Sequence, residues 1–219
     1  MSRFFSEKFA DLEPYVPGEQ PKERKYIKLN TNENAYPPHP AVTEAAAAAS
    51  RTLNLYSDPE CLELRKTLAE RLGLTPEELV ITNGSDEVLN FAFMAFCDRH
   101  IPAVFPDITY GFYPVFAKLN QIPYREIPLQ EDLTVRVEDY LQAACTIFLA
   151  NPNAPTGIAL SCAAIRDMLL AYPRDKVFVV DEAYADFGTE SVLPLLAQSS
   201  LLQMEIMIME QRIRVMRRS

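Results

Sequence analysis

The sequence predicts an α/β fold, a three-layer sandwich in which helices cover both faces of a mostly parallel sheet. From about residue 78, apolar segments of strand length alternate with segments of helical periodicity. Two apolar segments, "TIFLA" at 146–150 and "VFVV" at 177–180, are apolar nearly throughout, which is typical of strands covered on both faces. The 219 residues, 48% hydrophobic and 23% charged, are enough for a soluble domain with a core.

The elements can be assigned in order along the chain. A proline- and charge-rich lead-in reaches about residue 40. An alanine-rich stretch at 40–53 predicts a helix by propensity, and 59–74 predicts an amphipathic helix that ends at Gly73. The strands expected after it are 78–84, 101–107, 122–129, 145–153 and 175–184, and the helices between them are 85–98, 110–120, 135–144 and 161–173.

Charge and composition exclude several classes of protein. The net charge of −9 argues against a general binder of nucleic acid or anionic membranes. No apolar run reaches the roughly 18 residues of a membrane helix, and the N-terminus lacks the apolar region of a signal peptide, so we expect a cytoplasmic protein. No GxGxxG follows a strand, which disfavours a dinucleotide site. Metal-ligand spacing is absent among the cysteines and histidines, which are Cys61, Cys97, Cys145, Cys162, His39 and His100.

Ligands of parallel α/β sheets bind at the carboxyl ends of the strands, so the residues that follow each strand are the candidate site. In "NGSDE", Gly84 permits a tight turn before a helix whose free N–H groups could seat a phosphate, although an ordinary helix cap fits the same residues. In "DITYGFY", Tyr110 could present a flat face to a planar ligand or pack in the core. The segment "NPNAPTG" at 151–157 predicts a rigid turn.

Asp181 follows a strand that is expected to be buried on both faces, with Tyr184 three residues later. A buried carboxylate is costly unless it is paired, so we expect a cationic group to meet it. An anion seat, an aromatic face, an amide-rich turn and a buried carboxylate together fit a planar ring that carries a phosphate and a protonated nitrogen. Pyridoxal phosphate is such a ligand, and proteins tune it with a buried Asp at the ring nitrogen.

The order and spacing of six motifs resemble the fold-type I pyridoxal-phosphate-dependent aminotransferases: "LNTNENAYPP", "LYSDPE", "NGSDE", "DITYGFY", "NPNAPTG" and "VVDEAY". The resemblance covers about residues 1–200. It implies pyridoxal 5'-phosphate as cofactor and transfer of an amino group between glutamate and a keto phosphate. Aromatic amino acid aminotransferase and threonine-phosphate decarboxylase activities are the alternatives within the superfamily. It also implies small-molecule substrates and a homodimer for the intact enzyme, with no nucleic acid or membrane as partner.

By this resemblance, the residues at the helix start after the first large-domain strand bind the cofactor phosphate. These are Gly84, Ser85 and Asp86. Tyr110 would stack on the pyridine ring. Residues 1–45 would be an N-terminal arm and the start of a small domain, and 46–200 would be the N-terminal portion of an incomplete large domain.

The resemblance assigns Asp181 to the ring nitrogen and Tyr184 to the phenolic oxygen of the cofactor. The family often has Asn directly before "PTG" as a second partner of that oxygen. Here the residue is Ala154, and the preceding Asn153 is the candidate substitute.

Three further residues come from the N-terminal part of the chain. Tyr56 would reach the cofactor phosphate bound by the partner subunit. Asn34 and Tyr36, in the arm, would help to close over the substrate.

The chemistry needs a Schiff-base lysine, which the resemblance places about thirty residues after Asp181. No lysine follows Asp181, and Lys176 lies at the other end of its strand, roughly 16 Å away. We therefore expect a truncation or frameshift near residue 200, and a chain that alone is inactive, a catalytically dead fragment or a binding protein. The alternative is a natural short protein whose divergent tail, 201–219, forms an amphipathic helix with the apolar residues Leu202, Ile206, Met209, Ile213 and Met216.

Overall fold

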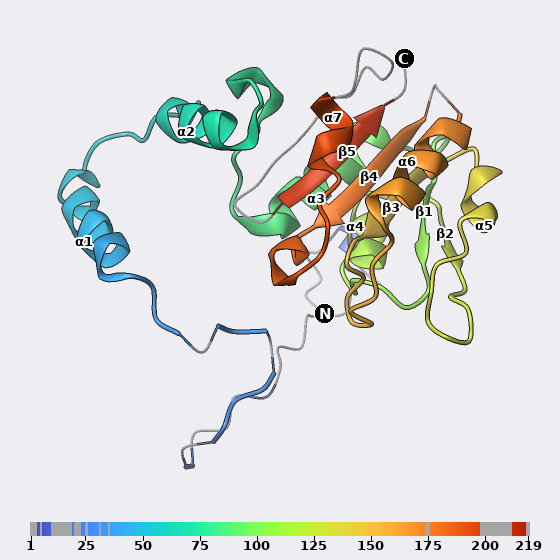
Figure 1. Ribbon diagram of the computed structural model, residues 1–219, viewed down its shortest axis with the longest axis horizontal. Coiled ribbons are helices and arrows are strands. Elements are labelled where there is room, and N and C mark those ends of the chain that lie inside the picture. The colour runs from blue at the N-terminus through green and yellow to red at the C-terminus, as the bar shows by residue number, and fades with distance from the viewer. Residues whose placement is uncertain are drawn as a thin grey trace. The chain divides into compact units, whose positions relative to one another are not determined.

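The computed structural model describes residues 4, 6–9, 19, 23–24, 26–30, 32–34, 36–173, 176–197 and 212–217 (Figure 1). The chain divides into two compact units, Glu13–Cys61 and Leu62–Ser219 with Met1–Leu12. The first unit contains α1 (Pro40–Ala49) and the 3₁₀ turn η2 (Ser50–Thr52). Proline at the first helical position and the run of alanines account for α1, which buries none of its residues.

The second unit contains the sheet and its helices. Its helical elements are η1 (Glu7–Phe9), α2 (Leu62–Leu72), η3 (Pro76–Glu78), α3 (Gly84–Phe96), α4 (Tyr113–Leu119), α5 (Glu138–Leu141), α6 (Cys162–Ala171), η4 (Ala185–Phe187) and α7 (Leu193–Ala197). Its strands are β1 (Ala103–Pro106), β2 (Tyr124–Ile127), β3 (Thr146–Ala150), β4 (Val177–Glu182) and β5 (Arg212–Arg217). Their order in the sheet is β2-β1-β3-β4-β5, and only β5 runs antiparallel to its neighbour. The expected mostly parallel sheet is confirmed.

Side chains alternate between the two faces of the sheet and build a core on each. On one face, Phe148 of β3 stacks on Phe93 of α3 at 3.9 Å between ring centroids, in a cluster that includes α4. On the other face, Ile147 and Leu149 join a cluster with Ile165 of α6 and residues of α2, α5 and α7. Figure 1 shows α6 in front of the sheet and α3 behind it. The predicted three-layer arrangement is therefore confirmed.

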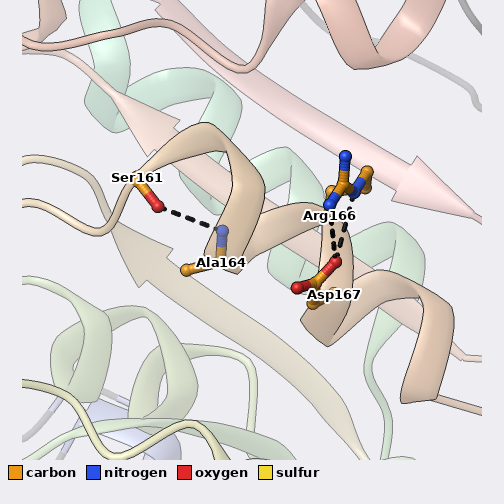
Figure 2. Close-up of polar contacts among 4 residues, drawn as sticks. All are labelled: Ser161, Ala164, Arg166 and Asp167. Atoms are coloured by element: carbon orange, nitrogen blue, oxygen red, sulfur yellow. Dashed lines mark hydrogen bonds and ion pairs between the residues drawn. The ribbon is translucent and has the colours of Figure 1, made fainter.

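Helix α6 shows how local sequence sets an element boundary. The Ser161 side chain accepts a hydrogen bond from the backbone N–H of Ala164 at 3.1 Å, which caps the helix (Figure 2). The buried side of α6 includes Ile165, so packing on the sheet adds to this cap. On the exposed side, Arg166 and Asp167 pair at 3.0 Å, a surface interaction that contributes little to stability.

The expected strand at 78–84 is wrong. Leu79 has an extended backbone and is buried, but Val80 is 39% exposed and no described strand pairs with this segment. An apolar run becomes a strand only where a neighbour completes its backbone hydrogen bonds.

The tail also differs from the helical alternative. Residues 212–217 form β5, which pairs with β4 from Val177↔Arg217 to Glu182↔Arg212. The letters "RIRVMR" alternate arginine with β-branched residues at first, which favours a strand, and β4 offers an open edge. The remaining positions of the predicted apolar stripe lie outside the described residues. These positions are Leu202, Ile206 and Met209.

Candidate active site

A cavity of roughly 200 Å³ lies where β3 and β4 end and α3 begins. Four segments that are far apart in the sequence contribute to its lining. The lining residues are Asn83, Gly84, Ser85, Asp86, Tyr110, Ala150, Pro152, Ala154, Asp181, Ala183 and Tyr184. The cavity thus brings together most of the residues predicted from the strand ends.

Asp181 is the buried acid of this cavity, with 5% of its surface exposed. Its Oδ2 accepts a hydrogen bond from the Tyr113 hydroxyl at 2.9 Å, and its Oδ1 accepts one from the Ala183 N–H at 3.0 Å. Burial raises the pKa of Asp181 from 3.8 to about 6, although both hydrogen bonds oppose the rise. A cationic group in the cavity would favour the charged carboxylate.

The N-terminus of α3 forms another part of the cavity wall. Gly84 has φ +72°, in the left-handed region that favours glycine, and this turn starts a helix of 13 residues. The side chain of Asn83 makes no capping hydrogen bond. The N–H groups of the first helical turn lack intrahelical acceptors, so this end of α3 can bind an anion.

Tyr110 lies between these two parts of the wall. Its hydroxyl donates to Oδ1 of Asp86 at 2.6 Å, and its ring contacts Phe112 and Tyr113 at centroid distances of 5.7 and 5.8 Å. Burial and the Asp86 carboxylate raise the pKa of Tyr110, so its phenol stays neutral. The aromatic face is therefore held in place by a residue of α3.

The side-chain amide of Asn153 stabilises the turn after β3. Asn153 accepts a hydrogen bond from the Thr109 hydroxyl at 2.7 Å and donates to the Ile108 carbonyl at 2.8 Å and to Thr156 Oγ1 at 3.2 Å. Both of its amide hydrogens are thus engaged within the protein. Ala154, not Asn153, lines the cavity, so the geometry gives no support to the predicted contact between Asn153 and a phenolic oxygen.

Three of the predicted site residues, Asn34, Tyr36 and Tyr56, belong to the first unit. Asn34 Oδ1 accepts a hydrogen bond from the Tyr36 N–H at 2.9 Å, and the side chains of Tyr36 and Tyr56 are exposed. Their roles at the substrate and at a partner subunit stay predictions.

Sequence reasoning missed Tyr113, whose hydroxyl contacts Asp181. One available signal was its place in the aromatic run 110–113, which leads into α4.

No lysine of the described residues lines the cavity. Lys176 precedes β4, and Asp181 lies at the far end of that strand. Within the same described part of the chain, no group of three or more His, Cys, Asp and Glu side chains is placed to hold a metal ion. None of the helices described there is long and apolar enough to span a membrane.

Chemically, the cavity offers backbone donors at one wall, an aromatic face beside them and a buried carboxylate at the end of β4. This arrangement fits a planar ring with an anionic substituent and a protonated nitrogen.

Comparison with known proteins agrees with this chemistry. Histidinol-phosphate aminotransferase of Acetobacter pasteurianus is 51% identical over 90% of this chain and 56% of its own length. Histidinol-phosphate aminotransferase 1 of Bradyrhizobium diazoefficiens is 48% identical, with the same coverage of each chain. The solved structure of the Sinorhizobium meliloti histidinol-phosphate aminotransferase, in complex with pyridoxal-5'-phosphate, has a TM-score of 0.74 at 23% identity and covers 85% of this chain and 55% of that one.

The chain therefore spans about half the length of the curated relatives it matches. The family model of aminotransferase class I and II matches residues 24–211, which include every lining residue of the cavity. The chain belongs to the aminotransferase class I and II family.

Proposed function

We propose that this chain supplies the cofactor-binding part of a histidinol-phosphate aminotransferase. The reaction would transfer an amino group between L-glutamate and imidazole-acetol phosphate to give L-histidinol phosphate, a step of histidine biosynthesis in the cytoplasm. The main support for the proposal is the cavity, which is lined by the α3 N-terminus, Tyr110 and Asp181. The names of relatives that are about half identical over nine tenths of the chain support the choice of substrate.

The residues around the cavity fit pyridoxal 5'-phosphate. Gly84, Ser85 and Asp86 at the start of α3 would seat the phosphate, with the N–H groups of Ser85 and Asp86 as donors, because the Gly84 N–H donates to the Thr82 carbonyl at 3.1 Å. Tyr110 would lie against the ring, and Tyr184 would donate to the phenolic oxygen. When bound, the cofactor supplies an electron sink for the substrate carbon.

Asp181 would stabilise the bound cofactor electrostatically. Its carboxylate would hold a proton on the ring nitrogen, and burial strengthens this interaction because little water screens it. The carboxylate of Asp86 would repel a phosphate, but its hydrogen bond with the Tyr110 hydroxyl directs it to the aromatic wall. We therefore assign Asp86 two roles, a backbone contact with the phosphate and a side-chain contact that orients Tyr110.

Further parts of the site would come from elsewhere. Tyr56 would contact the phosphate bound in the partner of a homodimer, and Asn34 and Tyr36 would help to cover the substrate. The proton transfers need a lysine, and none of the lysines among the described residues lines the cavity. We therefore expect the 219-residue chain by itself not to catalyse amino transfer.

Titration of the purified chain with pyridoxal phosphate, followed by its absorbance and by calorimetry, tests cofactor binding. We expect saturable binding that pyridoxal without phosphate does not reproduce, and a loss of affinity in Asp181→Asn. Asp167→Asn is the matched control, since this carboxylate is exposed on α6 and pairs with Arg166 (Figure 2). Equal affinity of the two variants would contradict the assignment of Asp181.

Two measurements test the catalytic part. After borohydride reduction with the cofactor, peptide mass mapping should find no lysine that is stoichiometrically modified, and a single fully modified lysine would overturn this expectation. In a chain that spans the full length of the relatives, imidazole-acetol phosphate should be the preferred acceptor. Preference for an aromatic keto acid, or decarboxylation of threonine phosphate, would instead support one of the two alternatives.

A further inference from the structure

We propose that Tyr113 is the positioning residue of this site, whose buried hydroxyl orients the Asp181 carboxylate and favours its ionised form for a cationic ligand. The identity of that ligand rests on the proposed function, but the contact between the two side chains does not. The residues are 68 positions apart, on α4 and β4.

The ring of Tyr113 is fixed by its surroundings. It is fully buried and packs among aromatic rings, with centroid distances of 5.6 Å to Phe105, 6.0 Å to Phe148 and 6.4 Å to Phe93. A phenylalanine would satisfy this packing equally well. The hydroxyl is the only polar group that the ring brings into the cluster, and it donates to Oδ2 of Asp181 at 2.9 Å.

The hydrogen bonds of Asp181 define the plane of its carboxylate. Tyr113 donates to one oxygen and the N–H of Ala183 to the other, so rotation of the group would break both bonds. Each oxygen keeps acceptor capacity for a ligand, because a carboxylate has about four lone-pair sites. The two donors therefore fix the orientation of the carboxylate and leave it able to accept hydrogen bonds from a ligand.

Tyr113 also acts on the charge of Asp181. Burial and the Asp181 charge raise the pKa of Tyr113 well above its ordinary value, so the phenol keeps its proton and remains a donor. The acids Asp86 and Glu182 act in the opposite direction on Asp181. The phenol of Tyr110, which also lines the cavity, is kept neutral by burial and by the Asp86 carboxylate, which raise its pKa.

An NMR titration of the 219-residue chain with ¹³C-labelled aspartate tests the proposal without any cofactor. Asp181→Asn assigns the Asp181 signal. In Tyr113→Phe we expect the pKa of Asp181 to rise by about one unit, since a donor to the charged form is lost. Tyr172→Phe is the matched control, because this buried hydroxyl donates to the Ala143 carbonyl at 2.9 Å. An unchanged pKa in Tyr113→Phe, or an equal rise in Tyr172→Phe, would overturn the proposal.

A measurement of cofactor affinity and a second substitution at position 113 test the proposal further. Affinity for pyridoxal phosphate should fall about fivefold in Tyr113→Phe at pH 6 and less at pH 8, because a pKa near 7 leaves less carboxylate at the lower pH. If Tyr113→Phe does not fold, 3-fluorotyrosine at this position, a stronger donor, should lower the pKa of Asp181, and a rise would count against the proposal. A shifted pKa in a chain that does not bind the cofactor would support the role of Tyr113 and refute the proposed cofactor.

Discussion

Asp181→Asn should stabilise the cofactor-free chain at neutral pH and not at acidic pH. The carboxyl is buried at the end of β4, and its pKa rises from 3.8 to about 6. A raised carboxyl pKa favours the protonated form of the folded chain. The stability that this group contributes is therefore fully present below about pH 3.8 and is lost as the pH rises through about 6.

The magnitude follows from the pKa difference. Each pKa unit corresponds to about 1.36 kcal/mol, so the change from 3.8 to about 6 corresponds to a destabilisation of about 3 kcal/mol at pH 8. The Tyr113 hydroxyl and the Ala183 N–H donate to different oxygens of Asp181, and asparagine replaces one of these oxygens with an NH2 group, which cannot accept, so one of the two bonds is lost. One lost bond costs about 1 kcal/mol. The net gain expected for Asp181→Asn at pH 8 is about 2 kcal/mol.

Urea unfolding of both proteins, measured at intervals from pH 4 to pH 8, checks this expectation. The variant should be slightly less stable than the parent at pH 4 and more stable at pH 8. Groups other than residue 181 titrate similarly in both proteins, so their effects cancel in the difference. A difference in unfolding free energy that does not change with pH would refute the reasoning, and so would a relative loss of stability as the pH rises.

Three other perturbations have definite expected results. Gly84→Ala should cost about 1–2 kcal/mol in urea unfolding, because φ is +72° and an added Cβ would contact nothing within 4 Å, so the cost is that of the backbone alone. Phe93→Ala should cost about 3–5 kcal/mol in the same assay, since it removes a fully buried ring stacked on Phe148, and a cost below 1 kcal/mol would contradict this packing. The thiol of Cys97 is buried with its pKa raised to about 12, so iodoacetamide at pH 8 should label it only after unfolding, as peptide mass mapping would show.

The alternation of apolar strands with periodic helices determined the α/β class, because strands covered on both faces need little polar sequence. The same pattern located the residues of the cavity, since the carboxyl ends of parallel strands lie along one edge of the sheet. Gly84, Tyr110 and Asp181 were predicted in this way, and the cavity contains all three.

Other features depend on partners that are distant in sequence, and local patterns do not encode them. Residues 212–217 pair as a strand because β4 offers an edge, and 78–84 do not because no described strand lies beside them. The amide of Asn153 is held by residues of the β1–α4 connection, more than 40 positions away, and its predicted contact with the phenolic oxygen stays a prediction. The sequence by itself determined which chemical groups gather at the sheet edge. The tertiary structure alone decided which of them line the cavity and which, like Tyr113, contact another residue of the site, because those contacts are made only when the layers pack.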